Sequence, residues 1–253
     1  MRRRALVLLV MATFAAAACG GNTPKPSPAT SRSPAASPTA VSPSVPPSSS
    51  PSSSSKPVDL PAGTPVSYAQ DVNAADLPAE ALVPAGTTPT DSWPAIAPDG
   101  TQYALVAFAA PSDDPLRQAR GLIVWRRFPD APPWRPVYGL SDPADAGVVG
   151  IHTLIGDATG DGSPDALTFE DTGGSGACGT WRVLDLAANT DVFKKKTCDA
   201  TIDLSPDPVG LVLREAVFGQ GDAHCCPSST RISILTFDEE SGWTVYSTTE
   251  QPA

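Results

Sequence analysis

The sequence is poor in residue types on which many enzymes and nucleic-acid-binding proteins depend. Only 2 of its 253 residues are histidine, aromatic residues make up 6%, and 27 Asp and Glu outweigh 17 Lys and Arg. Phosphate-binding glycine loops, Cys-x-x-Cys and His-Glu-x-x-His are all missing. The acidic balance argues against nucleic acid as a partner and favours cations. Scarce histidine leaves few candidates for a catalytic base.

An apolar stretch stands near the N-terminus but is too short to span a membrane as a mature helix. Arg2–Arg4 precede the apolar run Ala5–Phe14, and small residues then lead to Cys19. This arrangement resembles a bacterial lipobox, although Ala16 stands where Leu is usual. We therefore expect residues 1–18 to be a lipoprotein signal peptide and Cys19 to carry the lipid. The alternative is ordinary secretion with cleavage near the same point.

Residues 19–57 form a segment of unusual composition. They are mostly Pro, Ser, Thr and Ala, they include no aromatic residue, and Val41 and Val45 are their large aliphatic side chains. Such a segment cannot bury enough apolar area to offset its conformational entropy. We expect a disordered, semi-extended tether that holds residues 58–253 away from the extracytoplasmic face of the cell membrane.

Residues 58–253 are long enough for one domain with its own core. Helical periodicity is scarce, and Asp71–Leu82, which Pro78 interrupts, suits only short helical turns. Apolar runs bounded by Gly, Pro, Asp and Ser predict instead an all-β class, a single antiparallel β-sheet or sandwich of about nine strands. The expected strands are Gln102–Ala109, Gly121–Arg127, Val148–Ile155, Asp165–Glu170, Thr180–Leu186, Asp191–Lys196, Val209–Val217, Arg231–Phe237 and Trp243–Ser247.

The segment from residue 157 to 165, which reads Asp-Ala-Thr-Gly-Asp-Gly-Ser-Pro-Asp, is the strongest candidate for a binding site. Its alternating oxygen-bearing side chains suit a hard cation such as Ca²⁺, and Gly162 stands where the chain must turn sharply. An Asp-Gly turn that binds no cation is the alternative. The predicted Ca²⁺ ligands are Asp157, Thr159, Asp161 and Asp165, with the backbone carbonyl of Ser163.

The flanks of this Asp-rich loop read as short strands rather than helices. An EF-hand would need Glu at the twelfth loop position, where Thr168 stands. The loop resembles those of FG-GAP repeats (VCBS-like and integrin-α-type), in which an Asp-rich loop of this spacing joins two strands. The sequence contains no second copy of the loop, so we do not expect a propeller of such repeats.

Four cysteines remain once Cys19 is assigned to the lipid. An even set in an exported domain predicts two disulfides. Cys178 and Cys198 lie symmetrically about a predicted hairpin turn, but their pairing would leave Cys225 and Cys226 to form a strained vicinal bridge. We therefore favour bonds from Cys178 and Cys198 to one each of Cys225 and Cys226.

The two histidines, His152 and His224, supply the alternatives. Zinc held by thiolates and one histidine is the rival use of these cysteines, although the spacing matches no common zinc motif. Ser175 lies in a Gly-rich turn that resembles a nucleophile elbow only loosely. A hydrolase of wall glycan or lipid that uses Ser175 and one histidine is therefore the alternative function.

One longer stretch carries a family resemblance. The Asp-rich loop, a Gly- and Cys-containing segment, the run Asp222–Ser228 (Asp-Ala-His-Cys-Cys-Pro-Ser) and a final Trp-containing hairpin resemble the LppP/LprE family of actinobacterial lipoproteins, over residues 148–246. The resemblance implies a lipoprotein and no particular activity. We expect a monomeric, non-enzymatic binding or structural module, stabilised by Ca²⁺ and two disulfides, with a cell-wall or protein ligand.

Overall fold

The computed structural model describes residues 60–253 except residue 175. The expected signal peptide, Cys19, the whole tether and Ser175 therefore lie outside the described residues. The described part is all-β, with twelve strands and three short 3₁₀ helices. The predicted class is confirmed, but the single sheet or sandwich of about nine strands is wrong, because the strands form three antiparallel sheets of four. No helix in this part is long and apolar enough to cross a membrane.

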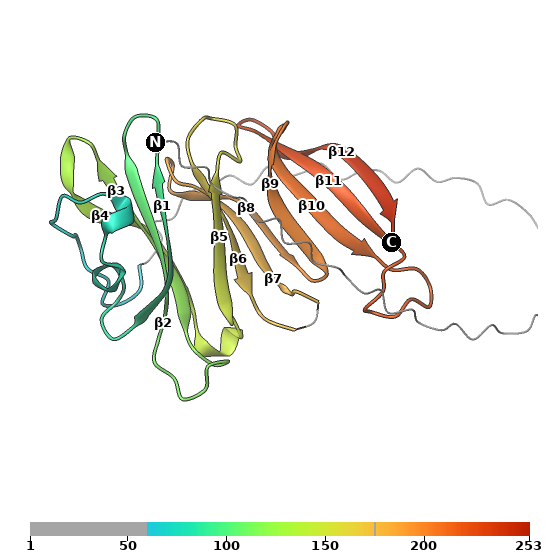
Figure 1. Ribbon diagram of the computed structural model, residues 1–253, viewed down its shortest axis with the longest axis horizontal. Coiled ribbons are helices and arrows are strands. Elements are labelled where there is room, and N and C mark those ends of the chain that lie inside the picture. Colours follow the sequence, from blue (N-terminus) through green and yellow to red (C-terminus); the bar gives the residue numbers. More distant parts are fainter. Residues whose placement is uncertain (1–59, 175) are drawn as a thin grey trace, which may run out of the picture. The chain divides into compact units, whose positions relative to one another are not determined.

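Each sheet is a meander of consecutive strands, and Figure 1 shows the three sheets side by side in chain order. The first contains β1 (Thr88–Ile96), β2 (Gln102–Ala109), β3 (Arg120–Phe128) and β4 (Ala131–Asp142). The second contains β5 (Gly150–Gly156), β6 (Asp165–Asp171), β7 (Gly179–Asp185) and β8 (Thr190–Thr197). The third contains β9 (Ala200–Pro206), β10 (Val209–Val217), β11 (Ser229–Asp238) and β12 (Gly242–Pro252).

The three strands that we did not predict, β1, β4 and β9, all lie at sheet edges. β1 contains Pro89 and Pro94, β4 contains three prolines, and β9 ends at Pro206. Proline has no N–H for the ladder and is tolerated where one side of a strand is unpaired. β1 is also largely exposed, so it lacks the apolar pattern that marks the inner strands.

Apolar side chains pack between neighbouring sheets. Leu105 and Leu122 of the first sheet share a buried cluster with Leu184 of the second. A separate cluster joins Leu167 of the second sheet to Leu211 of the third. Because β2 lies in a sheet that is covered on both faces, it reads as a continuous apolar run rather than as an alternating one.

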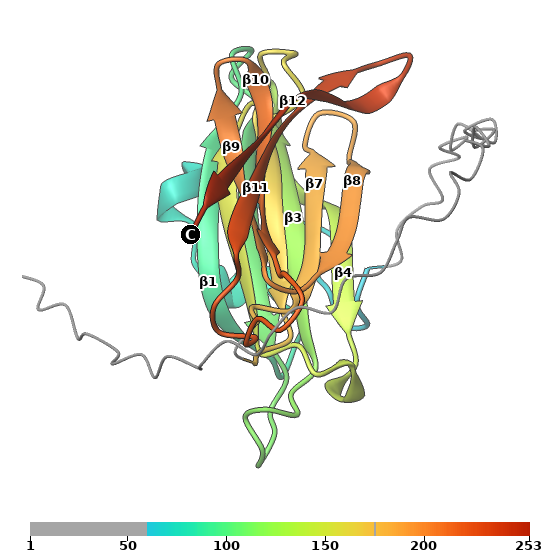
Figure 2. The same cartoon turned by 90° about the vertical axis from the view of Figure 1, so that its right-hand side faces the viewer.

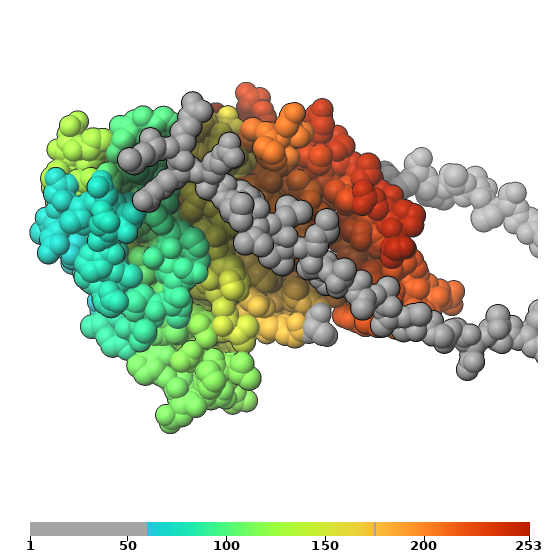
Figure 3. All heavy atoms as spheres, in the orientation of Figure 1, coloured from blue at the N-terminus to red at the C-terminus, as the bar shows by residue number. Residues whose placement is uncertain are grey.

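The segment before β1 covers the outer face of the first sheet. It contains the 3₁₀ helices η1 (Ala74–Asp76) and η2 (Ala79–Leu82), which fulfil the prediction of short helical turns interrupted near Pro78. Leu82 packs with the fully buried rings of Trp125 and Trp134, and the Trp125 indole N–H donates to the Leu82 carbonyl at 2.9 Å. Figure 3 shows this segment in cyan at one end of the described part. The third 3₁₀ helix, η3 (Ala144–Ala146), precedes β5.

Candidate functional site

The Asp-rich loop joins β5 to β6, so its predicted setting between two strands is confirmed. The ladder between these strands closes at Gly156 opposite Asp165, which places the first and last carboxylates of the loop at its base. Gly160 and Gly162 both have φ of +83°, a conformation in which other residues are strained. The glycines therefore allow the tight path of the loop.

Two of the loop carboxylates hold the loop backbone. The Asp157 carboxylate accepts the N–H of Gly160 at 2.6 Å through Oδ1 and that of Gly162 at 3.0 Å through Oδ2. The Asp161 carboxylate is exposed and accepts the N–H of Ser163 at 2.6 Å. An ionised carboxylate offers about four acceptor positions, so both side chains keep capacity for another partner.

The third carboxylate, Asp165, is fully buried, and its two oxygens differ. Oδ2 accepts the backbone N–H groups of Ala158 and Thr159 at 2.9 and 2.8 Å and the Thr159 hydroxyl at 3.0 Å. Oδ1 has no hydrogen-bond partner. Burial raises the pKa of the Asp165 carboxyl to about 6; the hydrogen bonds oppose this rise, and the charge of Asp185 adds to it. A buried carboxylate with an unpartnered oxygen is costly unless something positive approaches it.

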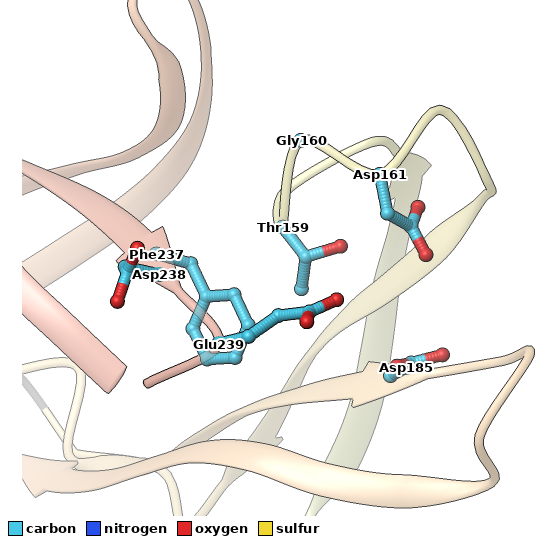
Figure 4. Close-up of a pocket in the computed structure, with 7 residues that line it drawn as sticks. All are labelled: Thr159, Gly160, Asp161, Asp185, Phe237, Asp238 and Glu239. Carbon is cyan, nitrogen blue, oxygen red and sulfur yellow. The ribbon is translucent and has the colours of Figure 1, made fainter. Parts of the chain in front are cut away.

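The loop forms one wall of an acidic hollow of about 390 Å³. In Figure 4 the Asp161 and Glu239 carboxylates lie towards its interior, whereas the Asp238 carboxylate turns away. Figure 2 shows how the β11–β12 hairpin of the third sheet extends towards the end of β7. The lining residues come from the loop, the end of β7 and the β11–β12 hairpin, and they are Thr159, Gly160, Asp161, Asp185, Phe237, Asp238 and Glu239.

The loop offers ligand atoms of the type that Ca²⁺ prefers, but the structure does not hold them in a coordinating arrangement. Within residues 60–253, residue 175 aside, no three His, Cys, Asp or Glu side chains are grouped so that they could hold a metal. The potential ligand atoms are nevertheless hard oxygens, and the glycines permit a tight loop. Oδ1 of Asp165 is buried without a hydrogen-bond partner. The residues therefore fit Ca²⁺ in type, and binding requires the carboxylates to move closer together.

Sequence reasoning missed two parts of this hollow. Asp185 was not singled out, because only the strand register places it opposite Asp165. The segment Asp238–Glu240 turns between β11 and β12, and Asp238 and Glu239 line the hollow. No local sequence signal marks either contribution, because the first depends on strand register within the second sheet and the second on how the second and third sheets meet.

The favoured disulfide pairing is wrong. Cys178 is bonded to Cys198, and Cys225 and Cys226 are free and exposed. The reason is the register of the β7–β8 hairpin: the ladder begins with Gly179 opposite Thr197, so the next residues outward, Cys178 and Cys198, meet directly. One disulfide is present among the described cysteines, rather than the two that we expected.

The two histidines lie on different elements. His152 is exposed on β5, whereas His224 lies on the β10–β11 loop with its Nε2 3.3 Å from Oδ2 of Asp199. The zinc alternative would need one of them among thiolates. No group of three metal-binding side chains is found in the described part, and Cys178 and Cys198 are already bonded to each other.

Comparison with known proteins adds no relative: the chain matches no family model, no curated protein and no solved structure.

Proposed function

We propose that this chain is a lipid-anchored, extracytoplasmic binding module, not an enzyme, whose ligand face is the acidic hollow and whose Asp-rich loop binds Ca²⁺. One observation carries the proposal. A loop from the second sheet and a hairpin tip from the third bring the carboxylates of Asp161 and Glu239 to one hollow beside the buried Asp165. Carboxylates that line one hollow attract a cation or a cationic ligand group.

The sequence resemblance to LppP/LprE lipoproteins supports the proposed location. A lipid on Cys19 and a tether over residues 19–57 would hold the domain near the membrane while the hollow faces a cell-wall or protein ligand. An acidic hollow favours a ligand that presents ammonium or guanidinium groups, or one that reaches the carboxylates through Ca²⁺. We further propose that the domain acts as a monomer.

The anchor predicts that Cys19→Ala changes the location of the protein. Without the thiol there is no acceptor for the lipid, so the variant is expected to leave the detergent phase or to accumulate as unprocessed precursor. Phase partition of cell extracts, followed by immunoblotting, measures this. Partition identical to that of the unaltered chain would contradict the lipid anchor and leave the Ca²⁺ proposal untouched.

The Ca²⁺ loop predicts a rise in thermal stability on adding the ion. Extracellular modules bind Ca²⁺ with Kd of roughly 10⁻⁴–10⁻³ M. By mass action, about 10 mM Ca²⁺ would then add roughly 1.4–2.7 kcal/mol to the free energy of unfolding. The measurement compares melting in EDTA with melting in Ca²⁺, and Mg²⁺ is expected to do less because it demands a tighter octahedral shell.

Two variants separate specific binding from general screening of an acidic protein. Asp161→Ala removes a loop carboxylate that is exposed and holds only one N–H, so it is expected to abolish the Ca²⁺ increment with little loss of stability in EDTA. Asp145→Ala removes a carboxylate of η3 that is also exposed, and it is expected to keep the increment. If the unaltered chain melts at the same temperature in EDTA and in Ca²⁺, the loop is only a turn.

A further inference from the structure

The loop between β10 and β11, residues 218–228, presents two adjacent cysteines to solvent. Cys225 and Cys226 are both exposed, and their Sγ atoms lie 2.9 Å apart. The sulfurs of a disulfide are about 2.0 Å apart, so a bond requires them to approach by only about 0.9 Å. Because the loop is exposed, this small movement does not disturb the packing between the sheets.

Side-chain hydrogen bonds hold this β10–β11 loop closed. Oδ2 of Asp222 accepts the N–H of Gly219 at 2.6 Å and the hydroxyl of Ser228 at 2.5 Å, which joins the two ends of the loop. The N–H of Cys226 donates to the Ala223 carbonyl at 2.9 Å and forms a tight turn. Both thiols are therefore held together on one turn of a closed loop.

A second set of contacts places the loop beside the disulfide-closed end of the β7–β8 hairpin. Nε2 of His224 lies 3.3 Å from Oδ2 of Asp199, and the His224 ring stacks on Phe218 with ring centroids 5.5 Å apart. Asp199 directly follows Cys198, which is bonded to Cys178. The chain thus brings one closed disulfide and one open dithiol to the same region.

We propose that Cys225 and Cys226 form a thiol–disulfide exchange site, which low-molecular-weight or protein disulfides oxidise to a vicinal bridge and thiols reduce again. This site is separate from the acidic hollow and does not depend on Ca²⁺. A bridge between adjacent residues closes a ring of eight atoms around one peptide bond. Because that ring is strained and exposed, the bridge is expected to be more easily reduced than the bond between Cys178 and Cys198.

The exchange takes two steps. The Cys225 thiolate attacks one sulfur of an external disulfide, RSSR, forming a mixed disulfide and releasing RS⁻. Cys226 then loses its proton to solvent, and its sulfur attacks the Cys225 sulfur and expels the second RS⁻. Two electrons pass from the cysteine pair to the external disulfide, which leaves as two thiols. The neighbouring Cys225 sulfur raises the pKa of the Cys226 thiol, which agrees with Cys225 acting as the first nucleophile.

The test is a redox titration of the purified chain in buffers that contain reduced and oxidised glutathione in varied proportion. After acid quenching, alkylation and peptide mass spectrometry report the state of each cysteine. Cys225 and Cys226 are expected to interconvert between a dithiol and an intramolecular disulfide while Cys178 and Cys198 stay bonded. The value of [GSH]²/[GSSG] at half-oxidation is expected to be at least about tenfold lower for the vicinal pair than for the Cys178–Cys198 bond.

Two single variants test the second step. Cys225→Ser and Cys226→Ser each remove one member of the pair, so the remaining thiol is expected to stop at a mixed disulfide with glutathione. Since both side chains are exposed, unchanged thermal melting confirms that the variants fold. The proposal is overturned if the unaltered chain forms only mixed disulfides at these positions, if both thiols stay free throughout, or if both cysteine pairs titrate together.

Discussion

Replacing Arg182 with methionine is expected to lower the free energy of unfolding by about 3–5 kcal/mol, because a buried carboxylate loses its charge partner. Arg182 on β7 is only 12% exposed and forms an ion pair with Glu170 on β6, which is 5% exposed. Its Nη1 also lies 2.7 Å from Oδ2 of Asp191 on β8. The Tyr138 hydroxyl of the first sheet donates to the other oxygen of Asp191 at 3.0 Å, so this network also joins two sheets.

The loss is expected to depend on pH, and its sign follows from Glu170. Burial raises the pKa of the Glu170 carboxyl, and the hydrogen bond and charge of Arg182 lower it without cancelling the rise. Removing Arg182 therefore raises this pKa further. A carboxyl whose pKa is higher in the folded chain than in the unfolded chain stabilises the fold at pH values below its unfolded-state pKa. This stability is lost as the pH rises through its folded-state pKa. Lowering the pH from about 7 to about 5 is thus expected to restore part of the stability of Arg182→Met.

An exposed arginine provides the matched control. Arg214 on β10 lies 2.5 Å from Asp203 on β9, but these side chains are 43% and 53% exposed. Exposed pairs contribute about 0–1 kcal/mol, so Arg214→Met is expected to cost at most about 1 kcal/mol and to show little change between the two pH values. Urea unfolding of both variants measures the difference. Equal losses would contradict the assignment of Arg182 as the buried partner of Glu170.

The inner strands could be predicted because burial leaves a clear pattern in the sequence. β2 and β10 begin and end at the predicted residues, since apolar side chains fill them and turn residues bound them. The division into three sheets was not predictable in the same way. It depends on which faces of the strands meet, and a strand buried on both faces, such as β2, gives no indication of how many sheets surround it.

The candidate site shows the same division between local and non-local information. The Asp-rich loop was located because its side chains, glycines and flanking strands are all encoded within one short segment. Asp185 joins the hollow only through the β6–β7 register, and Glu239 only through the packing of the third sheet against the second. The disulfide pairing was predicted wrongly because the strain of a vicinal bridge argued against a bond between Cys178 and Cys198. The hairpin register, which the sequence alone does not give, places these two cysteines together.

That register leads to a second large expected effect, on removal of the disulfide. Cys178 and Cys198 are 20 residues apart and close the open end of the β7–β8 hairpin. In the chain-entropy account, cross-linking a loop of this length stabilises the folded state by about 3 kcal/mol, because the unfolded chain loses conformational freedom. The double variant Cys178→Ser/Cys198→Ser is therefore expected to lose about 3 kcal/mol in urea unfolding at equal temperature.

The second cysteine pair makes this prediction discriminating. Cys225→Ser/Cys226→Ser alters only exposed, free thiols, and this adjacent pair closes no long loop. The free energy of unfolding of this variant is therefore expected to stay within about 0.5 kcal/mol of that of the unaltered chain. Cross-bonding between the two pairs would predict a different outcome, since either double variant would then remove both bridges. Comparable losses of unfolding free energy in the two double variants would therefore contradict the bond between Cys178 and Cys198. A loss confined to Cys178→Ser/Cys198→Ser is the result expected when the hairpin is closed by its own two cysteines.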